Sequence, residues 1–195
     1  MKRVSLWSPK GGVGKTTLAL NLAAAAYASG KKAIVCDLDP QQSAVDVFND
    51  KQLSFSVFKG MPPVTPYGDI IFYDLPPRVD IQIEGDLVVV PMRACVLDIR
   101  AVNKSIRHVR HKQILKCVNA VDVRRHDERM LAMRMYSEGA FLIKDRSIYS
   151  RAISMGKTVF DTDLYGANEA RKEMLRLFES LYSGLHAEAS RVAKS

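Results

Sequence analysis

The chain has few cysteines and no long apolar run. Its three cysteines, Cys36, Cys95 and Cys117, lie far apart and form no C-x-x-C pair. That spacing argues against a metal or iron–sulfur centre and favours buried thiols. No run of about 18 apolar residues occurs, although a membrane-spanning helix needs one. The start, Met1-Lys2-Arg3, leads into a short apolar run rather than the core of a signal peptide. We therefore expect a cytoplasmic protein.

Basic residues outnumber acidic ones: 29 Lys and Arg stand against 21 Asp and Glu, for a net charge of +8. Eleven of the basic residues and only four of the acidic ones lie between Arg93 and Arg134. Most of the excess is therefore concentrated in one region. Such an excess favours an acidic partner such as nucleic acid or anionic lipid.

At 195 residues, 47% of them apolar, the chain is long enough for one packed core and too short for two ordinary domains. Apolar runs at residues 4–7, 33–38, 70–73, 87–90 and 114–118 alternate with stretches of helical character. The alternation is typical of an α/β protein with a single doubly wound, mostly parallel sheet and helices on both faces. The helices are expected at residues 17–28, 43–49, 97–111, 124–138, 146–154 and 167–183. We expect this domain to span residues 1–184, followed by a polar tail at 185–195 that frays.

A glycine-rich segment follows the first apolar run, and it reads Lys10-Gly11-Gly12-Val13-Gly14-Lys15-Thr16-Thr17. A strand that ends in such a turn and opens a helix points several backbone N–H groups at one spot. Its glycines let the backbone approach anionic oxygens closely. Lys15 can then reach the β- and γ-phosphates of a nucleotide, and the Thr16 hydroxyl can bind Mg²⁺. Residues 10–17 therefore predict a P-loop that binds a nucleoside triphosphate.

The usual P-loop pattern, G-x-x-x-x-G-K-[ST], would place a glycine at position 9, where the chain has Pro9. Lys10 adds a second lysine instead. In this form the segment resembles the deviant Walker A motif, K-G-G-x-G-K-[ST], of the ParA/MinD family of ATPases. The resemblance implies that ATP is held between two copies of the chain and that Lys10 reaches across to the partner's nucleotide. Lys10 and Lys15 are therefore expected to be catalytic.

Carboxylates lie at the ends of two of the predicted strands: Asp37 and Asp39 close the second, and Asp74 closes the third. Because ligands of open parallel sheets bind beyond the carboxyl ends of the strands, these side chains should converge on the P-loop. Asp74 is predicted to bind Mg²⁺ through water, and a simple turn before Pro76 and Pro77 is the alternative.

The string Asp37-Leu38-Asp39-Pro40-Gln41 resembles switch I of partition ATPases. The resemblance implies that Asp37 belongs to the Mg²⁺ site and that Asp39 orients or activates the attacking water. A helix cap is the alternative role for Asp39. Residues 74–78 resemble switch II, although Leu75 replaces the common threonine and Arg78 stands where a small residue is frequent.

The family binds the base near the loops after the later strands, which here implies Asn119 and the segment 160–163. A turn residue is an equal alternative for Asn119.

Helical spacing within residues 97–111 separates two faces. The apolar face carries Ile99, Val102, Ile106 and Val109, and the basic face carries Arg100, Lys104, Arg107 and His111. A second basic cluster comprises Arg146, Arg151 and Lys157. A solvated surface is the ordinary explanation for either. The family resemblance implies instead a dimer that grips duplex DNA, and the lack of a recognition helix or zinc finger argues against sequence-specific readout.

Together with these features, the family resemblance implies a nucleoid-associated ATPase that segregates DNA. An ATP-bound homodimer would bind nonspecific DNA, and a cargo-bound partner of the centromere-binding type would stimulate slow hydrolysis to ADP. One alternative is a MinD-type ATPase at a membrane. That type needs an amphipathic C-terminal helix, whereas residues 186–195 hold one large apolar residue, Val192, so no stable membrane association is expected. The other alternative is a metabolic or assembly enzyme that uses the same loop.

Overall fold

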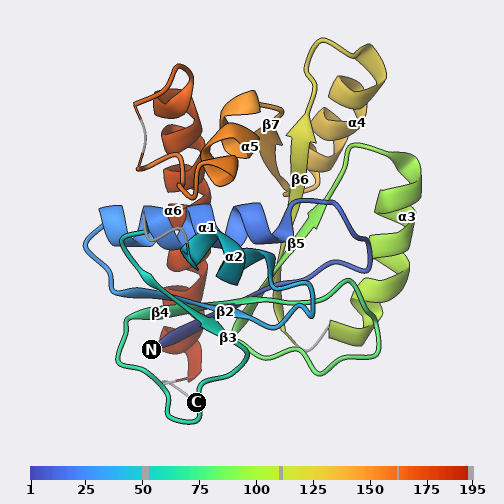
Figure 1. Ribbon diagram of the computed structural model, residues 1–195. Helices are drawn as coiled ribbons and strands as arrows, with labels where there is room; N and C mark the ends of the chain where they lie inside the picture. Colours follow the sequence, from blue (N-terminus) through green and yellow to red (C-terminus); the bar gives the residue numbers. More distant parts are fainter. Residues whose placement is uncertain (50–52, 110–111, 162, 193–195) are drawn as a thin grey trace.

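One parallel sheet forms the centre of the computed structural model, which describes residues 1–49, 53–109, 112–161 and 163–192 (Figure 1). Its order is β3-β2-β4-β1-β5-β6-β7, and every neighbouring pair is parallel. The strands are β1 (Lys2–Leu6), β2 (Ala33–Asp37), β3 (Ser56–Lys59), β4 (Ile70–Asp74), β5 (Leu87–Met92), β6 (Gln113–Val121) and β7 (Phe141–Lys144). The helices are α1 (Lys15–Ala28), α2 (Ser43–Asn49), α3 (Val96–Ser105), the 3₁₀ turn η1 (Ile106–Val109), α4 (His126–Ser137), α5 (Ser147–Ser154) and α6 (Ala167–Val192).

The predicted α/β class and parallel sheet are confirmed, and the five predicted strands correspond to β1, β2, β4, β5 and β6. The sequence did not indicate β3 and β7, which are the two edge strands. Each has only four residues. Because an edge strand is covered less completely than a central one, neither presents a long, fully buried apolar run.

The chain reverses strand order beside β1, so the end of β1 lies at the switch point where such sheets bind ligands.

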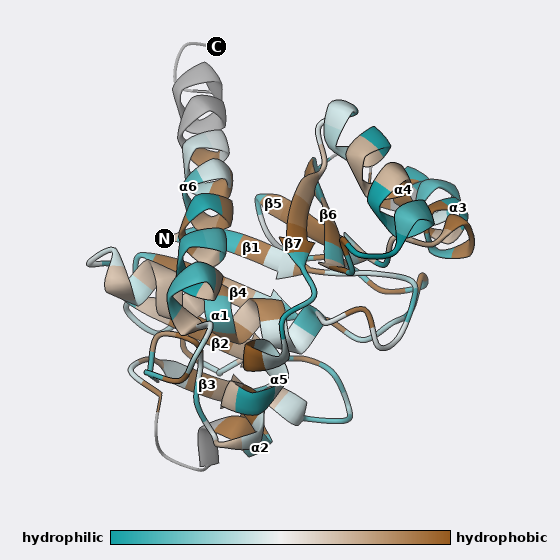
Figure 2. Cartoon of the chain, turned by 90° about the horizontal axis from the view of Figure 1, so that it is seen from above, coloured by the Kyte–Doolittle hydropathy of each residue, from teal (hydrophilic) through white to brown (hydrophobic). Residues whose placement is uncertain are grey.

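Helices cover the sheet from two sides. Alternate strand residues such as Leu6 and Phe72 pack with α1, α2, α5 and α6, while Cys36 and Val90 belong to the opposite core with α3 and α4. In Figure 2, α1, α5 and α6 lie together and apart from α3 and α4. Helix α1 is buried almost all round because it lies between the sheet and α6, which explains its Leu and Ala composition.

Helix α6 is longer than predicted. Its expected apolar face is buried, but the helix extends beyond its predicted end at residue 183, as far as Val192. Gly184 lies inside this helix, where a Cβ atom would lie 2.6 Å from Nε2 of Gln113. The glycine therefore allows close packing of α6 on the start of β6. None of the helices in the described ranges combines the length and apolar character required to cross a membrane.

Candidate nucleotide site

The P-loop connects the end of β1 to the start of α1. Gly12 and Gly14 have φ angles of 69° and 91°, in the left-handed region that glycine tolerates best. At Gly14 a Cβ atom would also lie 2.3 Å from Nδ2 of Asn119, so a side chain here would have to displace the Asn119 amide. The first turn of α1 has no acidic residue and no side-chain cap. Its backbone N–H groups therefore remain available to an anion.

The two lysines of the loop have different surroundings. Lys15 is only 7% exposed, and burial lowers its pKa while the nearby carboxylates of Asp74 and Asp39 oppose that shift. Lys10 is exposed, and its Nζ lies 3.8 Å from Oδ1 of Asp98 on α3. Lys15 lines a cavity that begins at the P-loop, and Lys10 does not. The monomer therefore directs one lysine into its own site and leaves the other at the surface.

Thr16 and Asp74 meet at the base of the loop. The Thr16 hydroxyl donates a hydrogen bond of 2.6 Å to Oδ2 of Asp74. Asp74 is fully buried, and its Oδ1 has no hydrogen-bond partner within the described part of the chain. Burial raises the pKa of Asp74 to about 7, while the Thr16 hydrogen bond acts in the opposite direction. Because a buried, unpartnered carboxylate oxygen is costly, this atom is suited to a cation or its bound water.

Asp37 lies directly beside Asp74 in the register of β2 and β4. Its Oδ2 accepts the backbone N–H groups of Ala44 and Val45 at 2.9 and 3.2 Å, and its Oδ1 accepts that of Asp39 at 3.1 Å. The carboxylate therefore caps α2, which is the role considered as the alternative for Asp39. The magnesium role of Asp37 stays a prediction.

Asp39 itself lines the cavity, and its Oδ1 accepts the backbone N–H of Gln41 at 3.0 Å. This position is compatible with the prediction that Asp39 orients or activates the attacking water. That role also stays a prediction.

A cavity of about 760 Å³ runs from the P-loop across the ends of β6 and β7. Asn119 lies on its wall and donates a hydrogen bond of 2.8 Å from Nδ2 to the Val13 carbonyl. The segment 160–163, expected near the base, does not line this cavity in its described residues, and residue 162 lies outside them. The preceding residue, Val159, instead donates its N–H to Oδ1 of Asn21 on α1 at 3.0 Å.

Sequence reasoning missed the far wall of the cavity, which includes Arg146, Tyr149, Ile153 and Met174. No motif marks these residues. Arg146 was assigned to a basic surface cluster, but its side chain is only 24% exposed and pairs with Glu173 on α6. The partners are 27 positions apart, so only the folded chain reveals the pair.

The donor set fits magnesium. In the described ranges no group of three or more His, Cys, Asp or Glu side chains could hold a metal ion. Mg²⁺ typically takes one or two protein ligands together with substrate phosphates and several waters. Thr16 and the free oxygen of Asp74 supply such ligands beside the P-loop.

Comparison with known proteins places the chain in a family. Residues 4–166 match the CobQ/CobB/MinD/ParA nucleotide binding domain. A segment of 44 residues is 52% identical to the chromosome-partitioning ATPase Soj of Thermus thermophilus, and it covers 23% of this chain and 18% of Soj.

Two solved structures share the fold. A putative plasmid partition protein from Borrelia burgdorferi B31 bound to AMPPNP has a TM-score of 0.76 at 17% identity, over 92% of this chain and 98% of that one. Cobyrinic acid a,c-diamide synthase from Mycobacterium smegmatis, with a bound ATP analog and magnesium, has a TM-score of 0.65 at 15% identity, over 94% of this chain and 97% of that one. Because the family match spans most of the sequence and includes the P-loop, the chain belongs to the CobQ/CobB/MinD/ParA nucleotide-binding domain family.

Proposed function

We propose that the chain is a magnesium-dependent ATPase that segregates DNA. The observation that carries the catalytic part is the buried group at the P-loop: Lys15 in the cavity, and Thr16 bonded to a carboxylate with one unpartnered oxygen. Lys15 neutralises charge on the β- and γ-phosphates, and Thr16 and Asp74 hold the metal. Bound Mg²⁺ supplies positive charge to the phosphates. Asp39, on the same cavity, orients the attacking water.

Nucleotide occupancy is expected to act on two segments. Residues 39–41 and 76–78 both line the cavity, so a γ-phosphate and its metal can hold both at once. Trp7, the single tryptophan, donates a hydrogen bond of 2.7 Å from Nε1 to the Arg78 carbonyl. Its fluorescence therefore provides a natural reporter of the second segment.

The dimer proposal concerns Lys10. Since this lysine is exposed and absent from its own cavity, a second chain can receive it. Replacing Lys10 with alanine is expected to abolish ATP-driven dimers while leaving nucleotide binding by the monomer. Sedimentation velocity with a nonhydrolysable ATP analogue measures both species, and Lys104→Ala, on exposed α3, is the matched control. Normal dimerisation of Lys10→Ala would refute the trans role.

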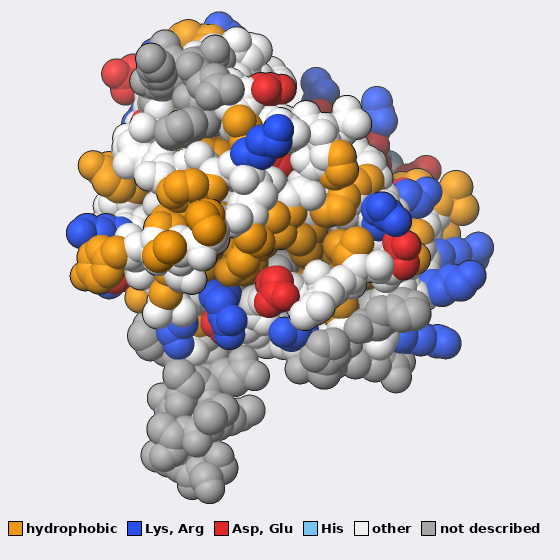
Figure 3. Space-filling view, turned by 60° about the horizontal axis from the view of Figure 1, so that its bottom comes forward, with side chains coloured by type: hydrophobic (Ala, Val, Ile, Leu, Met, Phe, Trp, Pro, Cys, Tyr) orange, Lys and Arg blue, Asp and Glu red, His pale blue; other side chains and the backbone are white. Residues whose placement is uncertain are grey.

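The proposed DNA surface is the outer face of α3 and η1. The helix is shorter than predicted, but its apolar residues Ile99, Val102, Ile106 and Val109 belong to the core as expected. Arg100, Lys104 and Arg107 are exposed and make no ion pair within the described residues. His111 lies outside those residues. Figure 3 shows Lys and Arg side chains gathered on the side where Figure 1 places α3.

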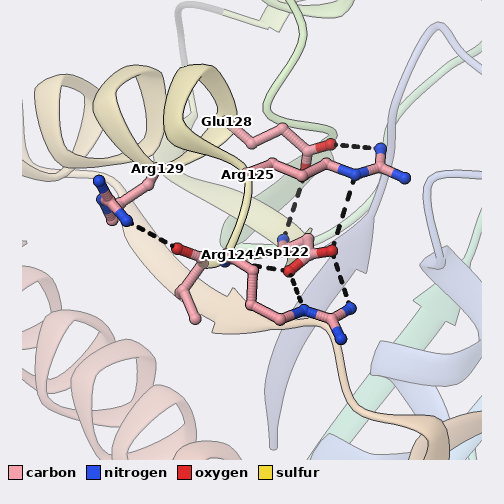
Figure 4. A network of polar contacts seen from close by, with 6 residues as sticks. Asp122, Arg124, Arg125, Glu128 and Arg129 are labelled. Carbon is pink, nitrogen blue, oxygen red and sulfur yellow. Dashed lines mark hydrogen bonds and ion pairs between the residues drawn. The ribbon is translucent and has the colours of Figure 1, made fainter.

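The turn between β6 and α4 is less suited to bind DNA, although it is rich in arginine. Figure 4 shows Asp122 between Arg124 and Arg125, with Glu128 bound to Arg125. These pairs lower the pKa of Asp122 to about 2, chiefly through the hydrogen bonds from the Arg124 side chain and backbone. Neutralised guanidinium groups attract phosphates less than the cations of α3 do, since those make no ion pair in the part of the chain that the structure describes.

A gel shift on random duplex DNA with ATP or ADP tests the DNA proposal. Binding should require ATP, and the logarithm of the affinity for DNA should fall linearly with the logarithm of the salt concentration. Equal binding with ATP and ADP would contradict the switch. In a parallel assay, ATP-dependent pelleting with anionic vesicles but no duplex binding would support the membrane alternative instead.

A further inference from the structure

The far wall of the nucleotide cavity contains a buried ion pair that no motif predicts. Arg146, just after β7, donates from Nε to Oε2 and from Nη2 to Oε1 of Glu173, both at 3.0 Å. Glu173 is 4% exposed, and its Oε2 also accepts the Tyr149 hydroxyl at 3.1 Å. Two donors thus fix the carboxylate, and the carboxylate fixes the plane of the guanidinium. Since Arg146 lines the cavity, it presents a preoriented group to whatever lies there.

The position of the pair along the sheet suggests which part of the ligand it meets. Arg146 follows β7, which is three strands from β1 in the order β1-β5-β6-β7. At about 4.8 Å per strand, the two ends of the cavity are roughly 14 Å apart. Since the cavity continues from the P-loop to Arg146, a nucleotide with its β-phosphate in the P-loop has room to extend its nucleoside toward β7. Asn119, on β6, lies between the two ends.

The charge of the pair also argues against a phosphate contact. Lys15 and the N-terminus of α1 already supply positive charge at the phosphate end. Arg146 is neutralised by Glu173, so the pair attracts anions weakly. Nη1 forms no hydrogen bond within residues 1–49, 53–109, 112–161 and 163–192, and about a quarter of the side chain is open. A planar guanidinium of this kind stacks on a base or donates to its ring acceptors.

We propose that Arg146 recognises the nucleoside half of the bound nucleotide and that Glu173 is its positioning residue. The inference rests on the proposed ATP site and assigns it a base-recognition residue that the sequence did not indicate. The competing explanation is purely structural: the pair joins α5 to α6, and loss of one partner would leave a buried charge. The experiment must therefore separate nucleoside recognition from folding and from phosphate binding.

Two probes make that separation when titrated calorimetrically with Mg²⁺: a nonhydrolysable ATP analogue and inorganic tripolyphosphate. Arg146→Lys keeps the charge but loses the planar fork, and Arg146→Met combined with Glu173→Gln removes both charges at similar volume. Each variant is expected to lose about tenfold to a hundredfold in affinity for the analogue. Affinity for tripolyphosphate should change by less than about twofold. Arg151→Met, at an exposed position of α5, is the matched control and should change the affinity for neither probe.

Glu173→Gln alone tests the positioning role. It leaves Arg146 in place beside a neutral partner. We therefore expect an intermediate loss of affinity for the ATP analogue and no loss of affinity for tripolyphosphate. The proposal would be overturned if the variants lost affinity equally for both probes, or if Arg146→Lys lost no affinity for the ATP analogue. If the unsubstituted chain bound neither probe, the nucleotide site itself would be wrong, which is a distinct result.

Discussion

Replacing Lys15 with alanine is expected to lower the affinity for Mg²⁺ and ATP by about a hundredfold or more and to abolish hydrolysis. The ammonium group lies almost buried in the cavity, where its interaction with phosphate is poorly screened. Among the residues that the structure describes, the other lysine on the cavity wall is Lys144, which lies at the β7 end. Calorimetric titration and a phosphate-release assay measure the two effects.

The same substitution is expected to leave the thermal stability of the chain unchanged or to raise it. Burial lowers the pKa of Lys15, so the empty site holds this charge at a cost. Lys15→Ala should therefore unfold at the same temperature as the unsubstituted chain or higher. Lys172→Ala, on the exposed face of α6, is the control and should keep full activity. Nucleotide affinity retained by Lys15→Ala would remove the lysine from the phosphate site.

Substituting Asp74 by asparagine is expected to reduce magnesium-dependent hydrolysis by about a hundredfold or more. The variant keeps an acceptor for the Thr16 hydroxyl but removes the charge and the free carboxylate oxygen. Release of phosphate at saturating ATP, measured over a magnesium series, tests this. Hydrolysis at the rate of the unsubstituted chain would contradict the assignment of Asp74 to the metal site.

The same substitution has a stability signature in metal-free buffer. Burial raises the pKa of Asp74 in the folded state to about 7, well above its unfolded value. The folded state therefore binds the proton more tightly, and stability falls as pH rises from about 4 to 7. Asp74→Asn should lack this contribution and should melt at a higher temperature at neutral pH. An equal or lower melting temperature at pH 7 would show that the buried charge is compensated.

Strands could be predicted from the sequence where an apolar run coincides with burial on both faces of the sheet. Central strands such as β2 and β5 are buried on both faces and appear as apolar runs. The edge strands do not, because four residues with one neighbouring strand carry little pattern. The end of α6 was predicted too early because the residues after Gly184 are polar and small, whereas the approach of Gly184 to Gln113 is visible only in three dimensions.

The candidate site divides in a similar way. Residues 10–17 are contiguous, and their glycines and hydroxyl have assigned positions in a known phosphate-binding turn. Asp74 was predicted from its place after a strand, but the bond to Thr16 and its unpartnered oxygen required the structure. Asp37 was read as a metal ligand, and its capping of α2 depends on how the chain folds back after Asp39. The Arg146–Glu173 pair joins two segments distant in sequence, so no spacing could indicate it.

The measurement that tests the central claim most directly is calorimetric titration of a nonhydrolysable ATP analogue into the purified chain, with Mg²⁺ and then with chelator. The P-loop, Thr16 and Asp74 together predict saturable binding at one site per chain that weakens strongly when magnesium is removed. Absence of binding, or binding indifferent both to magnesium and to Lys15→Ala, would contradict the account.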